Sequence, residues 1–228
     1  MLNFPIADNA GIMVHRSYGG YRNKYRVQSG KCIRLVSSII STRYLSLMIS
    51  KADAIQLYIQ AKDSNRPFLL NGAFAEGITL KIDVPTEAIS FPSSLFGRDA
   101  IADTLVRQFN QEYENIYTIC IGNKPDIEGV DFSCYWLVVM TEKQSGTLRV
   151  GCGEYEWNFN ATSNTVQSLS IAIDTMETAP SASVTDAMAW VSDLPYPWAE
   201  LSVVAREAPD VSAITRVMQH LVKLHKSC

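Results

Sequence analysis

Apolar residues recur at helical spacing in three segments of the first half of the chain. These segments are residues 50–64, 64–77 and 98–113. In the first, one stripe holds four of the apolar residues: Ala54, Leu57, Tyr58 and Ala61. Ser50 is suited to cap this helix, and Gly77 is suited to end the second. The pattern therefore predicts three helices in succession.

The pattern then changes to runs rich in β-branched and aromatic residues. Strands are predicted over residues 78–84, 115–122, 130–142, 147–159 and 165–176. Short polar segments, KQSG and NATSN, separate the last three runs and are typical of hairpin turns. Three helices followed by a strand meander indicate an α+β fold, with the helices on one face of a strongly bent antiparallel sheet.

Both ends of the chain differ from this central region, which we take as residues 48–178. Residues 179–228 predict two short helices, and we expect this C-terminal helical extension to pack on the domain, since it cannot bury much area alone. Residues 1–47 hold seven Lys or Arg and one acid, so their net charge is +6 against −9 for the remainder. We interpret them as a basic, poorly ordered N-terminal extension.

The basic segment leaves several interpretations open. Tyr18, Tyr21 and Tyr25 lie among its cations, and aromatic rings between cations are typical of nucleic-acid binding. Its arginine and serine content also resembles a targeting segment. A third interpretation is a poorly ordered extension, or a segment upstream of Met48 as the natural first residue. We favour this last interpretation and expect no nucleic-acid partner.

Composition narrows the possible chemistry. No uncharged apolar run approaches the length of a membrane-spanning helix, so no membrane contact is expected. The five cysteines show no CxxC spacing, which fits a reducing, cytoplasmic location. The three histidines are His15, His220 and His225, and none lies between residues 16 and 219. This argues against histidine catalysis and histidine metal sites, and we expect neither a metal nor a cofactor.

Four sequence features together resemble a known superfamily. They are LYIQAKDSNR, AFAEGITLKI, GRDAIADTLVRQF and the closing strand meander. Residues 50–178 resemble the nuclear transport factor 2 superfamily, especially its SnoaL-like and ketosteroid-isomerase-like members, which have a cystatin-like fold. The resemblance implies a cone-shaped α+β domain with an apolar pocket and a homodimer formed through the sheet. It implies no single activity, because the fold hosts enzymes and non-catalytic modules alike.

The resemblance also suggests catalytic residues, although the set is incomplete. Ketosteroid isomerase uses an aspartate base and an oxyanion hole formed by a tyrosine and a protonated carboxylic acid. Tyr58 matches the tyrosine, but the aspartate position falls on Ile82, with Asp83 one residue later and so on the opposite face of a strand. Cys152 falls at the second acid, where it is a poor donor.

Two nearby acids could replace the missing carboxylate if the strand register allowed it. Glu154 and Glu156 alternate with three aromatic residues, Tyr155, Trp157 and Phe159. Strand alternation favours the aromatic residues for the buried face, so the two glutamates are expected to face water.

The sequence leaves three functions open. The favoured one is binding of a small apolar or aromatic molecule in the pocket without a complete catalytic set. The alternatives are a cofactor-independent isomerase, cyclase or lyase that uses Tyr58 with Asp83 or a glutamate, and a dimerisation module with a filled pocket. The candidate ligand-binding residues are Tyr58, Phe74, Phe109, Tyr117, Trp136, Tyr155 and Trp157.

Overall fold

The computed structural model describes residues 49–85 and 89–226 of the 228-residue chain. The chain divides into two units, Met1–Ser46 and Leu47–Cys228, and the described residues belong to the second. The N-terminal extension predicted over residues 1–47 therefore lies outside the described residues.

The first helix, α2 (Lys51–Asp63), begins at the predicted cap. The Ser50 hydroxyl accepts a hydrogen bond from the Asp53 backbone N–H at 3.1 Å, and the Asp53 carboxylate accepts one from the Ser50 N–H at 3.2 Å. This reciprocal capping box satisfies donors that the helix itself leaves free. Its buried face includes Ile55, Tyr58 and Ile59.

The second helical segment is shorter than the sequence predicts. A 3₁₀ turn, η1 (Pro67–Leu69), leads into α3 (Leu70–Ala73), and strand β1 (Phe74–Asp83) begins directly afterwards. Phe74 pairs with Val166, so a sheet contact ends the helix before Gly77. The third helix is continuous: it consists of α4 (Arg98–Ile101), a π-helical segment η2 (Ala102–Gln108) and α5 (Phe109–Glu112).

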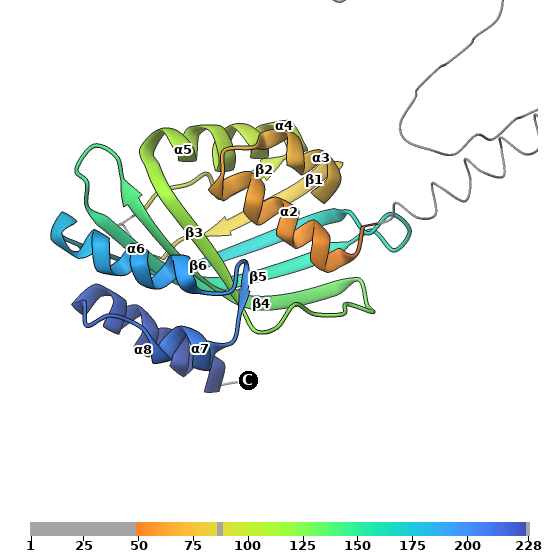
Figure 1. The fold of residues 1–228 in the computed structure, drawn as a ribbon. Coiled ribbons are helices and arrows are strands. Elements are labelled where there is room, and N and C mark those ends of the chain that lie inside the picture. Colours follow the sequence, from red (N-terminus) through yellow and green to blue (C-terminus); the bar gives the residue numbers. More distant parts are fainter. Residues whose placement is uncertain (1–48, 86–88, 227–228) are drawn as a thin grey trace, which may run out of the picture. The chain divides into compact units, whose positions relative to one another are not determined.

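A seven-stranded sheet forms the centre of the domain, in the order β2-β1-β6-β5-β4-β3-β7 (Figure 1). Besides β1, its strands are β2 (Ser94–Phe96), β3 (Tyr113–Ile121), β4 (Asp131–Glu142), β5 (Leu148–Phe159), β6 (Val166–Ala179) and β7 (Trp198–Ala199). The α+β class is confirmed. The sheet is mixed rather than wholly antiparallel, because β1 runs parallel to β6 and β7 parallel to β3.

Two glycines on β5 allow the strands to approach closely where the pairing with β6 is irregular. The register between these strands shifts between Cys152 and Gly153. A Cβ atom at Gly153 would lie 2.0 Å from the Ala172 carbonyl oxygen, and one at Gly151 would lie 2.6 Å from the Met176 side chain. The glycines of RVGCGEYE are therefore sites of close backbone approach in the sheet.

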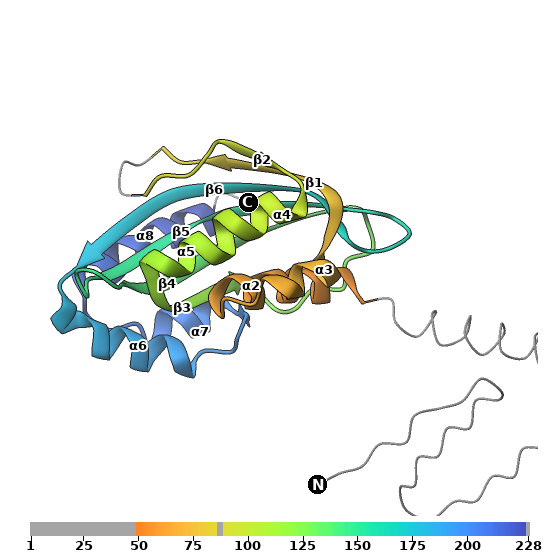
Figure 2. The same ribbon diagram turned by 90° about the horizontal axis from the view of Figure 1, so that it is seen from above.

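Each face of the sheet has its own hydrophobic core. We call the face that packs against α2 and the α4–α5 helix the inner face. Its core includes Tyr58, Phe74, Leu80, Trp136 and Trp157. Part of the opposite, outer face of β3 to β6 is covered by the C-terminal helices α6 (Val184–Asp193), α7 (Leu201–Arg206) and α8 (Ser212–Lys226) (Figure 2).

The C-terminal segment is attached to the sheet by polar contacts as well as by its core. A 3₁₀ turn, η3 (Ser181–Ser183), leads into α6. Strand β7 adds to the edge of β3, where the Cys120 N–H donates to the Pro197 carbonyl at 2.7 Å. Arg216 of α8 donates to the Glu177 carboxylate of β6 at 2.7 Å. The segment therefore covers part of the face through which the resemblance implies a dimer.

We predict that Gly153→Ala destabilises the protein by about 1–3 kcal/mol or more, because the new methyl group forces the β5 and β6 backbones apart. Gly77→Ala in β1 is the control, since its Cβ would meet its nearest neighbour, the Phe96 ring, at an ordinary 3.7 Å. Urea unfolding measures both free energies. Equal losses for the two variants would contradict the role assigned to Gly153.

Candidate functional site

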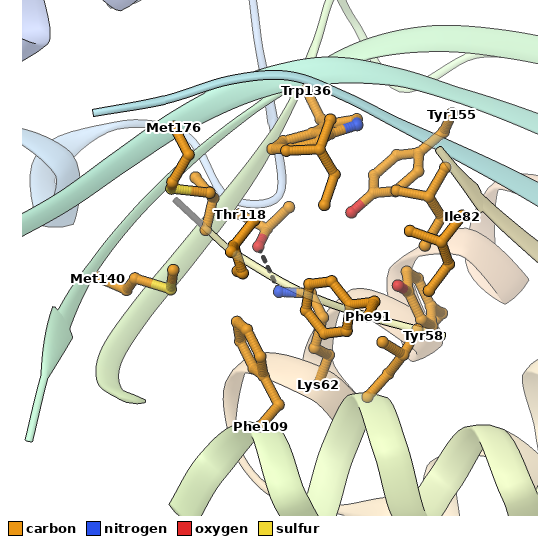
Figure 3. A pocket seen from close by; sticks show the side chains of 15 residues that line it. Tyr58, Lys62, Ile82, Phe91, Phe109, Thr118, Trp136, Met140, Tyr155 and Met176 are labelled. Carbon is orange, nitrogen blue, oxygen red and sulfur yellow. Dashed lines mark hydrogen bonds between the residues drawn. The ribbon is translucent and has the colours of Figure 1, made fainter. Parts of the chain in front are cut away.

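A cavity lies between the inner face of the sheet and the helices α2 and α4–α5. Its volume, measured as the space open to the centre of a water molecule, is about 50 Å³. This exceeds the roughly 10–15 Å³ that one water needs. Fifteen side chains line it (Figure 3), mostly aliphatic and aromatic, among them Ile82, Phe91, Val138 and Met176.

Four of the seven ligand-binding residues proposed from the sequence line this cavity: Tyr58, Phe109, Trp136 and Tyr155. Phe74 and Trp157 lie behind Tyr58, with ring centroids 5.3 and 5.5 Å from its own. They hold the Tyr58 ring in place rather than lining the space. Tyr117 packs against the outer core and contacts Tyr196, ring to ring, at 6.3 Å.

The carboxylates suggested as catalytic groups lie on the outer face. Ile82 lines the cavity, and the next residue, Asp83, lies in a surface groove with Glu154, Glu156 and Lys81. The structure therefore does not bring Asp83 together with Tyr58. Both glutamates point away from the aromatic residues of β5, as strand alternation predicts.

Cysteine at the second acid position also faces outward. Cys152 is buried in the core beneath α8, where its thiol contacts the Val217 carbonyl at 3.9 Å. Burial raises the pKa of this thiol to about 12, so it stays protonated and unreactive. Within residues 49–85 and 89–226, no three His, Cys, Asp or Glu side chains gather closely enough to hold a metal ion.

Tyr58 is the central polar residue among the aromatic rings. It is 1% exposed, and its hydroxyl has no hydrogen-bond partner of acceptable geometry among the described residues. Burial raises its pKa, while the neighbouring Tyr155 hydroxyl has a smaller opposing effect. Burial also raises the pKa of Tyr155. Figure 3 shows both hydroxyls turned toward the cavity, where they remain neutral.

An ion pair that the sequence analysis missed lies at the C-terminal end of α2. The Lys62 ammonium lines the cavity and donates to the Asp63 carboxylate at 2.5 Å and to the Thr118 hydroxyl at 2.7 Å. The two side chains are 9% and 3% exposed. The sequence held a signal for it: Lys62 follows Tyr58 by four residues, which places a charge on the buried stripe of the helix.

Both oxygens of the Asp63 carboxylate accept hydrogen bonds. One accepts from Lys62 and, at 2.9 Å, from the Thr118 hydroxyl. The other accepts from the Thr118 backbone N–H at 2.7 Å and from the Tyr196 hydroxyl at 3.1 Å. Asn110 of α5 further donates to the Lys62 carbonyl at 2.6 Å. The pair thereby connects α2 with β3, α5 and the segment before β7.

The arrangement is a buried, hydrogen-bonded ion pair at the edge of an apolar space. The Lys62 ammonium also lies 5.2 Å from the centroid of the Phe109 ring. Such a pair adds little net stability compared with apolar side chains, but breaking it leaves an uncompensated buried charge. Its chemical capacity is hydrogen-bond donation into the cavity by an ammonium and two neutral phenols.

Comparisons with known proteins give likenesses in fold alone. No model of a known protein family matches the chain, and no curated protein matches it. Solved structures do resemble it. One is a hypothetical protein with a ketosteroid isomerase-like fold from Catenulispora acidiphila, in complex with trimethylamine. Its identity is 14%, the match covers 52% of this chain and 82% of that one, and the TM-score is 0.42.

Two further structures carry related descriptions. An NTF2-like protein from Burkholderia xenovorans is 14% identical over 62% of this chain and 98% of its own, with a TM-score of 0.42. A putative SnoaL-like polyketide cyclase from Mesorhizobium loti is 13% identical over 52% of this chain and 93% of its own, with a TM-score of 0.38. These descriptions name the superfamily that the sequence features resemble.

We predict that Asp63→Asn destabilises the protein by about 3–5 kcal/mol, because Lys62 then keeps a buried charge without its partner. Asp103→Asn, which breaks the exposed pair with Arg107, is the control and costs about 0.3–0.5 kcal/mol. Adding Lys62→Met to Asp63→Asn restores part of the loss. Chemical denaturation measures all three, and equal effects of the two Asn variants would argue against a buried pair.

We also predict that stability falls as the pH rises above about 10, the ordinary pKa of tyrosine. Burial raises the pKa values of Tyr58, Tyr155 and Tyr196, so the folded protein keeps protons that the unfolded chain releases. Urea unfolding between pH 9 and pH 11, about one pH unit either side of the ordinary tyrosine pKa, measures this slope. Tyr155→Phe makes the decline shallower; a slope that this variant leaves unchanged would count against the assignment.

Proposed function

We propose that this domain binds a small apolar or aromatic molecule in the cavity of the inner face. The observation that carries the proposal is the lining itself: aromatic and aliphatic side chains surround a space into which a few polar groups converge. This combination is typical of small-molecule sites. The Tyr58 hydroxyl supports the proposal, since a buried donor without a partner in the described chain is costly unless a bound molecule pairs with it.

The cavity has a neighbour through which a ligand could arrive. A surface groove of about 410 Å³ shares Ile89, Phe91 and Phe109 with the cavity and continues to Glu142 and Arg149. The Phe91 and Phe109 ring centroids lie 6.1 Å apart. In this proposal, the two rings separate the groove from the cavity. They must move apart to admit an aromatic ring, because the cavity of about 50 Å³ is smaller than the roughly 150 Å³ that holds benzene.

An isomerase, cyclase or lyase has weaker support. Such chemistry needs a base beside the substrate, and among the described residues that line the cavity none is Asp, Glu or His. Lys62 is ionisable, but it is paired with Asp63. We therefore place ligand binding ahead of catalysis.

The homodimer remains a prediction. The helices α6, α7 and α8 cover part of the outer face of β3 to β6, and the outer face left open carries Lys81, Asp83, Glu154 and Glu156. A second copy would have to pack on this polar part or elsewhere.

No helix among the described residues is long and apolar enough to cross a membrane.

We predict that Val138→Phe abolishes binding of a monocyclic aromatic such as toluene, because the added ring fills the cavity that Val138 lines. Val130→Phe adds the same ring at a position that is 38% exposed and serves as the control. Ligand-observed NMR detects toluene binding to each variant. Undiminished binding to Val138→Phe would show that toluene occupies another site.

A further inference from the structure

We infer that Lys62 is the principal ligand-binding donor of the cavity, held in place by Tyr196 of the C-terminal segment, and that the ligand is a neutral molecule with a hydrogen-bond acceptor. This inference rests on the proposed function. It adds the chemistry of the ligand and assigns a role to a segment that lies outside the central region of residues 48–178.

The number of donors on Lys62 is the first step. A lysine ammonium has three N–H donors and no acceptor. Two of them are used, one by the Asp63 carboxylate and one by the Thr118 hydroxyl. Among the described residues no oxygen or nitrogen accepts the third, and the nearest group reported beside the ammonium is the Phe109 ring, with its centroid at 5.2 Å; Lys62 lines the cavity (Figure 3). A bound acceptor atom would complete its coordination.

Two other lining residues carry buried donors that no described residue pairs with. The Tyr58 hydroxyl and the Trp136 indole N–H are buried and have no hydrogen-bond partner within the described chain. An indole N–H can only donate. A ligand acceptor near Lys62 and Tyr58 would pair with donors that the protein leaves unpaired, whereas a purely apolar ligand would leave both unsatisfied.

Charge decides between a neutral and an ionised ligand. The positive charge of Lys62 is already balanced by Asp63 at 2.5 Å, and no other lining residue carries a charged side chain. A bound carboxylate would bring an unbalanced negative charge into an apolar space, and a bound ammonium would meet Lys62 with a like charge. Burying an unpaired charge is costly, so a neutral acceptor such as a carbonyl oxygen fits best.

The orientation of Lys62 depends on a contact from far along the chain. Asp63 fixes the ammonium, and Asp63 is itself fixed by Thr118 and by the Tyr196 hydroxyl at 3.1 Å. Tyr196 precedes β7, the strand that joins the C-terminal segment to the edge of β3. Tyr196 is thus a positioning residue, which acts on the ligand through Asp63 and Lys62.

Isothermal titration calorimetry with four small probes tests the inference. Acetophenone and α-methylstyrene have nearly the same shape, but the first has a carbonyl oxygen where the second has a methylene group. We expect the wild-type protein to bind acetophenone about tenfold more tightly or better, the effect of one hydrogen bond from a charged donor. Benzoate and benzylammonium, the ionised probes, should bind more weakly than acetophenone.

Three variants identify the residues responsible. Lys62→Met removes the preference for acetophenone and leaves α-methylstyrene binding in place. Tyr196→Phe reduces the same preference and serves if Lys62→Met does not fold. Tyr117→Phe is the matched control, because its ring contacts Tyr196 but its hydroxyl is not a partner of Asp63. It should keep the full preference.

The outcomes separate the two proposals. Equal wild-type affinities for acetophenone and α-methylstyrene would overturn the Lys62 inference and leave the proposed function standing. Absence of binding by both would overturn the proposed function. Tighter binding of benzoate would overturn the requirement for a neutral ligand. A Tyr196→Phe variant with an unchanged preference would remove Tyr196 from the mechanism.

Discussion

The ion pair between Lys62 and Asp63 connects the three parts on which this structure depends. It lies at the end of α2 and forms hydrogen bonds with Thr118 on β3. Asp63 also accepts a hydrogen bond from the Tyr196 hydroxyl of the C-terminal segment. Because both side chains are buried, neither charge can be removed alone without cost. The same pair places an ammonium at the edge of an apolar cavity, so stability and binding capacity share one set of contacts.

The sheet makes this arrangement possible by carrying a core on each face. The inner face packs against α2 and the α4–α5 helix and leaves the cavity between them. The outer face packs against α6, α7 and α8. Strand β7 brings that second layer to the edge of β3, beside Asp63. The C-terminal segment thus contributes to the cavity without lining it.

Sequence patterns predicted the architecture better than the site. Helical spacing located α2 and α4–α5, and strand alternation placed Tyr155 inward and Glu154 outward. The parallel pairing of β1 with β6 could not be predicted, because it depends on contacts between distant segments. Lys62 was missed although its spacing from Tyr58 placed it on the buried stripe, since a lysine near a helix end usually faces water. Its partners Asp63 and Thr118, and the Tyr196 hydroxyl that bonds Asp63, come together only in the folded chain.

The most direct test is ¹⁵N NMR of the lysine side chains. An ammonium held by Asp63 and Thr118 exchanges its protons slowly with water, so Lys62 should give a separate, protected signal that Lys62→Met removes. Acetophenone should shift this signal, and α-methylstyrene should shift it far less. A wild-type spectrum with no protected ammonium, or a signal that both probes shift equally, would contradict the account.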